Sequence, residues 1–153
     1  MSDTERRLPV YLLLDCSESM VGDGIESVQR GVAALLQELR SDPHALETVW
    51  LSAITFANEA TQAVPLTSLD QVSLPPLRVR PGTALGAGLT LLHDCIRREV
   101  RQHSAETKGD WRPIAFLFTD GVPTDSWERA AAETRNFHLA GPLNVIAIGC
   151  GED

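Results

Sequence analysis

The sequence has few cysteines, and those it has lack the spacing of a metal or redox site. Cys16, Cys95 and Cys150 are an odd number with no C-x-x-C pair, which argues against a disulfide framework and a zinc site. All three lie in apolar stretches, so we expect small buried thiols in a reducing cytoplasm. The four histidines also lack ligand spacing and are expected to be structural or exposed: His44, His93, His103 and His138.

Long hydrophobic runs are missing as well. The longest apolar stretches have the length of a strand and fall far short of the roughly 18–20 residues that a membrane span needs. Residues 1–7 contain no apolar core of the kind found in signal peptides. We therefore expect a cytoplasmic protein that does not associate with membranes.

Lysine is almost absent, since Lys108 is the one lysine among 13 basic residues, and the net charge is −8. A chain this acidic repels phosphate backbones, so we expect no nucleic-acid partner. Two arginine clusters stand out: Arg78 with Arg80, and Arg97 and Arg98 with Arg101. Solvated surface charge is the plain interpretation of both clusters, and a contact surface for an acidic or phosphorylated partner is the alternative.

The pattern of apolar residues predicts strands that alternate with helices within one domain, residues 1–153. The expected strands are 8–14, 49–57, 61–65, 113–119 and 143–149. The expected helices are 25–40, about 17 residues from Thr83, and 125–139. Residues 67–77 are broken by prolines and are expected to be irregular, with at most one helical turn.

This alternation predicts an α/β fold, a doubly wound and mostly parallel sheet with helices on both faces. Asn58 and Glu59 read as a turn, so strand 61–65 becomes an antiparallel edge strand, where Pro65 disturbs the sheet least. The last strand of such a sheet is normally covered by another helix. We therefore expect either a short sheet or a further helix or strand segment after Asp153.

Oxygen-bearing side chains follow the strands at one edge of the predicted sheet. Asp15, Ser17 and Ser19 come directly after the first strand, Thr83 precedes a helix, and Asp120 follows the strand 113–119. In open α/β sheets, ligands bind at the carboxyl ends of the strands. Three hydroxyls and two carboxylates suit Mg²⁺, which prefers six oxygen ligands. The order of these residues therefore predicts a divalent-metal site.

Each part of this pattern also has a plainer interpretation. Asp15 with Ser17 and Ser19 would cap and turn a loop, and Thr83 would be a helix N-cap. The main enzymatic alternative is a Mg²⁺-dependent phosphotransferase or phosphatase with Asp15 as its nucleophile. Such an enzyme needs a second acid where Ser17 stands, and Lys108 has no evident route to the site. No P-loop or G-x-S-x-G motif is present.

Three motifs resemble the von Willebrand factor type A (VWA) domain and its metal-ion-dependent adhesion site: 15–20 (DCSESM), 82–86 (GTALG) and 119–121 (TDG). Residues 81–89, 109–113 and 119–125 resemble more narrowly the bacterial TerY-like branch, which is associated with tellurite resistance and stress. The resemblance implies a Rossmann-like VWA fold. It also implies hydroxyl ligands from Ser17, Ser19 and Thr83, and carboxylates from Asp15 and Asp120 that bind largely through water.

Two positions depart from the family pattern. Glu18 and Pro81 stand where glycine is common, and Glu18 adds a third carboxylate near the ion, which bears on a choice of Mn²⁺ or Ca²⁺ over Mg²⁺. The site is rich in oxygen ligands and poor in acid–base groups. We therefore expect a non-enzymatic module that binds an Asp or Glu of a partner protein. The TerY-like resemblance adds a partner kinase and phosphatase, with Ser17, Ser19 or Thr83 as phosphorylation sites.

Overall fold

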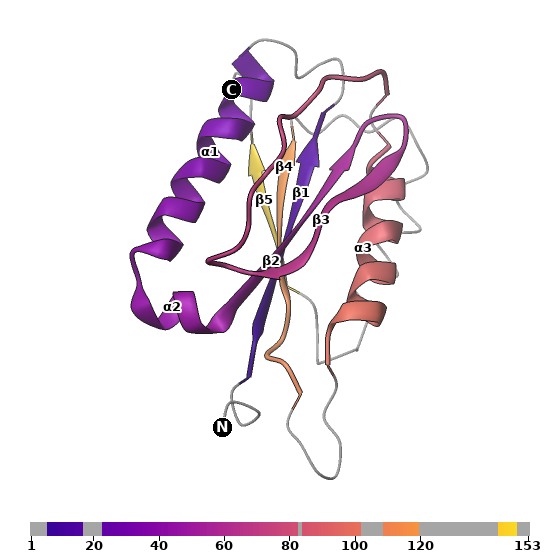
Figure 1. The fold of residues 1–153 in the computed structure, drawn as a ribbon. Helices are drawn as coiled ribbons and strands as arrows, with labels where there is room; N and C mark the ends of the chain where they lie inside the picture. The colour runs from indigo at the N-terminus through magenta and orange to yellow at the C-terminus, as the bar shows by residue number, and fades with distance from the viewer. Residues whose placement is uncertain (1–5, 17–22, 83, 102–108, 120–143, 150–153) are drawn as a thin grey trace.

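The computed structural model describes residues 6–16, 23–82, 84–101, 109–119 and 144–149 (Figure 1). In these ranges the strands are β1 (Leu8–Asp15), β2 (Val49–Phe56), β3 (Ala60–Ser68), β4 (Ile114–Thr119) and β5 (Asn144–Gly149). The helices are α1 (Asp23–Arg40), α2 (Pro43–Thr48) and α3 (Leu85–Glu99). The strands form one sheet in the order β3-β2-β1-β4-β5.

The sheet is parallel except at one edge. β1 pairs in parallel with β2 and β4, and β4 with β5, whereas β3 runs antiparallel to β2. Figure 1 shows α1 and α3 on opposite faces of the sheet. The predicted fold class, a mostly parallel sheet with an antiparallel edge strand and helices on both faces, is therefore confirmed.

The central strand β1 is apolar throughout because both of its faces are covered. Leu12 and Leu14 pack in a cluster with α1, while Tyr11 and Leu13 pack in a second cluster with α3. Successive side chains of a strand point to opposite faces, so a strand between two helical layers loses the usual polar alternation. This explains why the sequence shows an unbroken apolar run from Leu8 to Leu14, which ends at Asp15.

Two local details differ from the sequence prediction. The edge strand β3 continues to Ser68, three residues beyond Pro65, because register shifts in its pairing with β2 accommodate the proline. The short helix α2 was not predicted. Its N-cap is Asp42, whose carboxylate accepts a hydrogen bond from the His44 backbone N–H at 3.0 Å, and Pro43 begins it. The predicted helix 125–139 lies outside the described residues.

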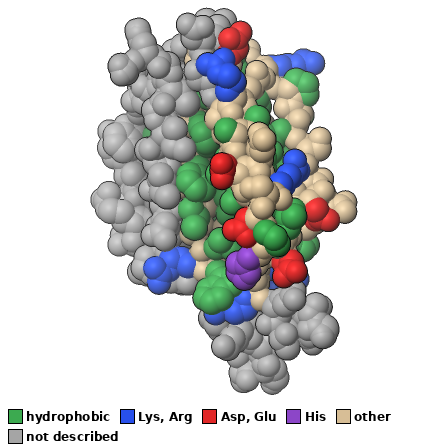
Figure 2. All heavy atoms as spheres, turned by 90° about the vertical axis from the view of Figure 1, so that its left-hand side faces the viewer, with side chains coloured by type: hydrophobic (Ala, Val, Ile, Leu, Met, Phe, Trp, Pro, Cys, Tyr) green, Lys and Arg blue, Asp and Glu red, His purple; other side chains and the backbone are tan. Residues whose placement is uncertain are grey.

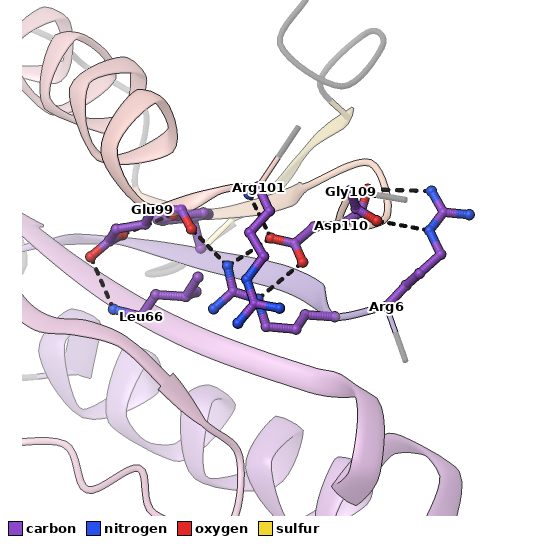
Figure 3. Close-up of polar contacts among 8 residues, drawn as sticks. Arg6, Leu66, Glu99, Arg101, Gly109 and Asp110 are labelled. Atoms are coloured by element: carbon purple, nitrogen blue, oxygen red, sulfur yellow. Dashed lines mark hydrogen bonds and ion pairs between the residues drawn. The ribbon is translucent and has the colours of Figure 1, made fainter. Parts of the chain in front are cut away.

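A buried ion pair closes the end of the molecule where the parallel strands begin, which we call the base. Asp110 is 1% exposed and accepts two hydrogen bonds from the guanidinium of Arg7, at 3.0 and 2.7 Å. It also accepts one from the backbone N–H of Arg101 at 2.8 Å (Figure 3). Arg7 donates in addition to the Glu99 carbonyl at 2.7 Å. The pair thus ties β1, the end of α3 and the segment before β4 together.

Glu99 is the centre of a second polar cluster beside this ion pair. Its carboxylate accepts hydrogen bonds from the Tyr11 hydroxyl at 2.9 Å and from the Gln62 side-chain amide at 3.0 and 3.1 Å. It also accepts one from the Leu66 backbone N–H at 3.2 Å (Figure 3). Burial and the neighbouring Glu99 charge raise the pKa of Tyr11 above its usual range. Glu99 therefore fixes the edge strand β3 against α3.

The opposite end of the sheet is the one at which the parallel strands end. We call this end the rim. The chain reverses its winding direction between β1 and β4, which is the place where open α/β sheets bind ligands. No helix within the described ranges is long and apolar enough to span a bilayer.

Candidate metal centre

Asp15 is the last residue of β1 and lies at the rim, as predicted. Its side chain is fully buried although it carries a carboxylate. It pairs with Phe56, the last residue of β2, and the next residue, Cys16, donates its backbone N–H to the Phe56 carbonyl at 2.8 Å. Open α/β sheets bind their ligands at the carboxyl ends of the strands, so the position of Asp15 is typical of a ligand site.

β4 reaches the same rim. Leu14 of β1 pairs with Phe118 of β4, so one residue further along the two parallel strands come Asp15 and Thr119. Asp120 follows directly but lies outside the described residues. The register thus brings the residues that precede Asp120 to the rim next to Asp15.

The residues on either side of Thr83 are also fixed at the rim. Ala84 donates its backbone N–H to the Ala57 carbonyl at 2.6 Å, just beyond the end of β2. Gly82 has φ +89°, and a Cβ there would lie 2.8 Å from the Asn58 Cα. Only glycine meets both the left-handed backbone and this close approach. The N-cap position of α3 is Ala84, whose side chain makes no capping hydrogen bond, and Thr83 itself lies outside the described residues.

Of the five predicted ligands, Asp15 alone belongs to the described residues, and Ser17, Ser19, Thr83 and Asp120 lie outside them. Within the described part of the chain, no group of three or more His, Cys, Asp or Glu side chains is placed to hold a metal ion. The ligand set therefore stays a prediction. The residues present suit a hard cation, because Asp15 supplies a buried oxygen ligand at the rim.

The two described thiols are unreactive at neutral pH. Cys16 and Cys95 are buried and free, as predicted, whereas Cys150 lies outside the described residues. Burial raises the pKa of each thiol to about 11, although Arg80 acts on Cys16 in the opposite direction. At neutral pH both are protonated, and a protonated thiol is a poor nucleophile and a poor metal ligand. The described cysteines thus offer no catalytic group.

Arg80 is a residue of the rim whose place the sequence did not reveal. Its backbone N–H donates to the Cys16 carbonyl at 2.8 Å, directly after Asp15. Its guanidinium donates to the Thr55 hydroxyl of β2 at 3.3 Å. The signal in the sequence was the pair Arg78 and Arg80 in an acidic chain. Because Arg80 is far from Cys16 in the sequence, the sequence alone did not show that the two residues are bonded at the end of β1.

Solved structures with this fold come from diverse proteins. One is an aerotolerance-related membrane protein from Bacteroides fragilis, with 23% identity over 94% of this chain and 68% of that chain, and a TM-score of 0.66. A second is BatB, a conserved hypothetical protein from Bacteroides thetaiotaomicron, with 24% identity over 93% of this chain and 66% of that chain, and a TM-score of 0.63. These identities establish a shared fold alone.

A pilus adhesin, SpaC from Lactobacillus rhamnosus GG, has the same fold in a much longer protein. It is 21% identical over 78% of this chain and 15% of that chain, with a TM-score of 0.62. This chain thus spans between 15% and 68% of the lengths of the three structures. No curated protein is significantly similar to it.

The family model of the von Willebrand factor type A domain matches residues 10–153, which is nearly the whole chain and includes every predicted metal ligand. Domains of this family are generally adhesion and interaction modules, and they often hold a divalent metal at the rim of the sheet. With a mostly parallel sheet that has one antiparallel edge strand, as predicted, and with Asp15 at its switch point, sequence and architecture agree. The chain belongs to the von Willebrand factor type A domain family.

Proposed function

We propose that this domain binds a partner protein through a divalent cation at the rim. The ligands of the cation are Asp15, Ser17, Ser19, Thr83 and Asp120, and the cation is Mg²⁺, with Mn²⁺ and Ca²⁺ as alternatives. One observation carries the proposal. A fully buried carboxylate, Asp15, ends the central strand of a VWA domain at the switch point of the sheet.

Three neutral hydroxyls in this ligand set leave much of the charge of the ion uncompensated. When bound, the cation supplies an electrophilic position that takes an oxygen from outside the domain, and an Asp or Glu of the partner is the matching ligand. The protein backbone fixes the direction in which this open coordination position points. The close packing of Gly82 on Asn58 and the hydrogen bond of Ala84 hold the backbone on both sides of Thr83.

Binding is better supported than catalysis. A phosphotransferase with Asp15 as nucleophile requires a second acid, and Ser17 occupies the position where that acid would stand. The two described cysteines are protonated at neutral pH, because burial raises the pKa of both thiols to about 11. We therefore propose no enzymatic activity for the domain.

The partner is a protein. On the face that carries α1 and α2, acidic and basic side chains of the described residues are scattered among hydrophobic ones, with no basic patch to attract a phosphate backbone (Figure 2). The buried free thiols favour a reducing cytoplasm as the place of action. Following the TerY-like resemblance, we place the domain in a bacterial stress or tellurite-resistance system.

Phosphorylation is the regulation that this resemblance suggests. A phosphate on Ser17, Ser19 or Thr83 would add about −1.5 to −2 charges at the cation and compete with the carboxylate of the partner. After incubation with a candidate Ser/Thr kinase, we expect intact-mass spectra to show one added phosphate and peptide mapping to locate it at one of these residues. No added phosphate, or phosphate at other residues alone, would end the idea.

The proposed function is tested with a defined peptide. A 12-residue Gly-Ser peptide with one central Asp should bind the domain in Mg²⁺, as followed by NMR chemical-shift titration, which detects millimolar affinity. Binding should disappear in EDTA, with Asn in place of the Asp of the peptide, and in the Asp15→Ala and Asp120→Ala variants. Binding that persists unchanged in EDTA and in both variants would show that no metal bridge exists.

A further inference from the structure

Residues 69–80, which follow β3, lead back to the rim and contain two arginines near their end. After Ser68, at the base, Leu69 donates its backbone N–H to the Val49 carbonyl, and the chain then crosses the α1 face of the sheet (Figure 1). Leu74 and Leu77 pack against the core on this face. The segment ends at the rim, where Arg80 is bonded to Cys16. Packing along its length therefore fixes where its charged residues emerge.

Two arginines lie at the end of this segment. Arg78 is exposed, and Arg80 is half-buried with its guanidinium against Thr55. Thr55 precedes Phe56, the strand partner of Asp15, so Arg80 contacts the neighbouring strand one residue before its end at the rim.

The balance of charge here differs from that of the whole chain. The net charge of the protein is −8, which repels an acidic partner at long range. Among the described residues at this part of the rim, which are Asp15 and residues 57–60 and 78–82, Arg78 and Arg80 stand against Glu59 and Asp15. Two positive and two negative charges therefore balance here before any cation is counted. An arginine also offers a carboxylate two parallel hydrogen-bond donors.

We propose that Arg78 and Arg80 form a second anion-binding contact beside the cation and select a partner segment that carries several carboxylates. This inference rests on the proposed function, in which one carboxylate binds the cation. An extended chain advances about 3.3 Å per residue, so acids one to three residues from the metal-bound acid reach the arginines. The ligand is therefore an acidic stretch of a protein and not an isolated Asp or Glu.

The experiment compares two peptide probes in Mg²⁺. One is the 12-residue Gly-Ser peptide with a single central Asp, and the other carries three additional Glu residues beside that Asp. We expect the wild-type domain to bind the tetra-acidic peptide about five- to tenfold more tightly, as two partly exposed charge contacts allow. In the Arg78→Gln/Arg80→Gln variant this preference should fall to about twofold or less, because the Kd of the tetra-acidic peptide rises more than that of the single-acid peptide.

Two further variants separate specific contact from general charge and from folding. Arg112→Gln makes the same change of charge as Arg78→Gln, at an exposed residue just before β4, at the base, and should keep the full preference. Arg78→Gln alone leaves the contact between Arg80 and Thr55 in place and should lose about half of the effect on a logarithmic scale. An intact fold is verified by the thermal unfolding of each variant.

The outcomes distinguish this inference from the function on which it rests. If the double variant keeps the wild-type preference, the arginine contact is wrong and the metal-dependent binding stands. If the wild-type domain binds neither peptide in Mg²⁺, both are wrong. A preference that depends on the arginines but survives EDTA would support the arginine contact and overturn the metal bridge.

Discussion

Replacing Asp110 by alanine is expected to lower the free energy of unfolding by about 3–5 kcal/mol, because the change leaves the charge of Arg7 buried without its partner. Asp110 is 1% exposed and Arg7 is 13% exposed, and two short hydrogen bonds join them. The same carboxylate holds the backbone N–H of Arg101, so the change also frees a part-buried backbone donor. A loss of this size is a large part of the 5–15 kcal/mol that is typical of a domain.

Urea unfolding followed by circular dichroism measures this loss, and Asp94→Ala supplies a matched control. Asp94 also pairs with an arginine, Arg97, at 3.5 Å, but both side chains are more than half exposed. Solvent screens such a pair, so its removal should change the free energy of unfolding by about 0–1 kcal/mol. If the two alanine variants prove equally stable, the buried pair does not hold the base of the sheet together.

Much of the architecture was predictable because apolar periodicity reports burial directly. β1, β2, β4 and β5 follow from runs of apolar residues, and α1 from apolar residues at helical spacing. The antiparallel position of β3 followed from the turn at Asn58 and from Pro65, which suits an edge strand. In each case the physical cause lies within one segment of the sequence.

The errors concern features whose cause lies elsewhere in the chain. Thr67 and Ser68 were predicted to be irregular, but they pair with Leu51 and Trp50 of β2, which lie 16 and 18 residues earlier. The helix α2 is short and was not predicted. Asp42 and Pro43 begin it, but the same two residue types are also typical of the end of a preceding helix. Pairing with β2 determines that Thr67 and Ser68 form a strand, and one capping hydrogen bond favours the helix α2.

The site was predictable in part for the same reason. The position of Asp15 follows from the end of an apolar strand, and the structure places it at the rim as predicted. The burial of Asp110 could not be predicted from the sequence, because its partner Arg7 is 103 residues away. A carboxylate that serves structure and one that serves a ligand look alike in sequence. Their place at the base or at the rim distinguishes them.

Magnesium should raise the thermal stability of this domain, and Asp15→Asn should abolish that gain. At 100 times its Kd, a cation that binds only the folded state adds about 2.7 kcal/mol, which corresponds to a rise in Tm of roughly 5–11 °C for a domain of this size. Asp15 is fully buried, so its replacement by the uncharged isostere removes a ligand charge with little change in volume.

The measurement is differential scanning calorimetry of each variant with and without Mg²⁺, Mn²⁺ or Ca²⁺. Because a change at a buried residue alters stability by itself, the informative quantity is the shift in Tm that the cation causes within one variant. Asp94→Asn, an exposed acid on α3, should retain the full shift. If 10 mM of each cation changes the Tm of the wild-type domain by only about 1 °C or less, the rim does not bind a metal. Asp15 would then be a structural carboxylate.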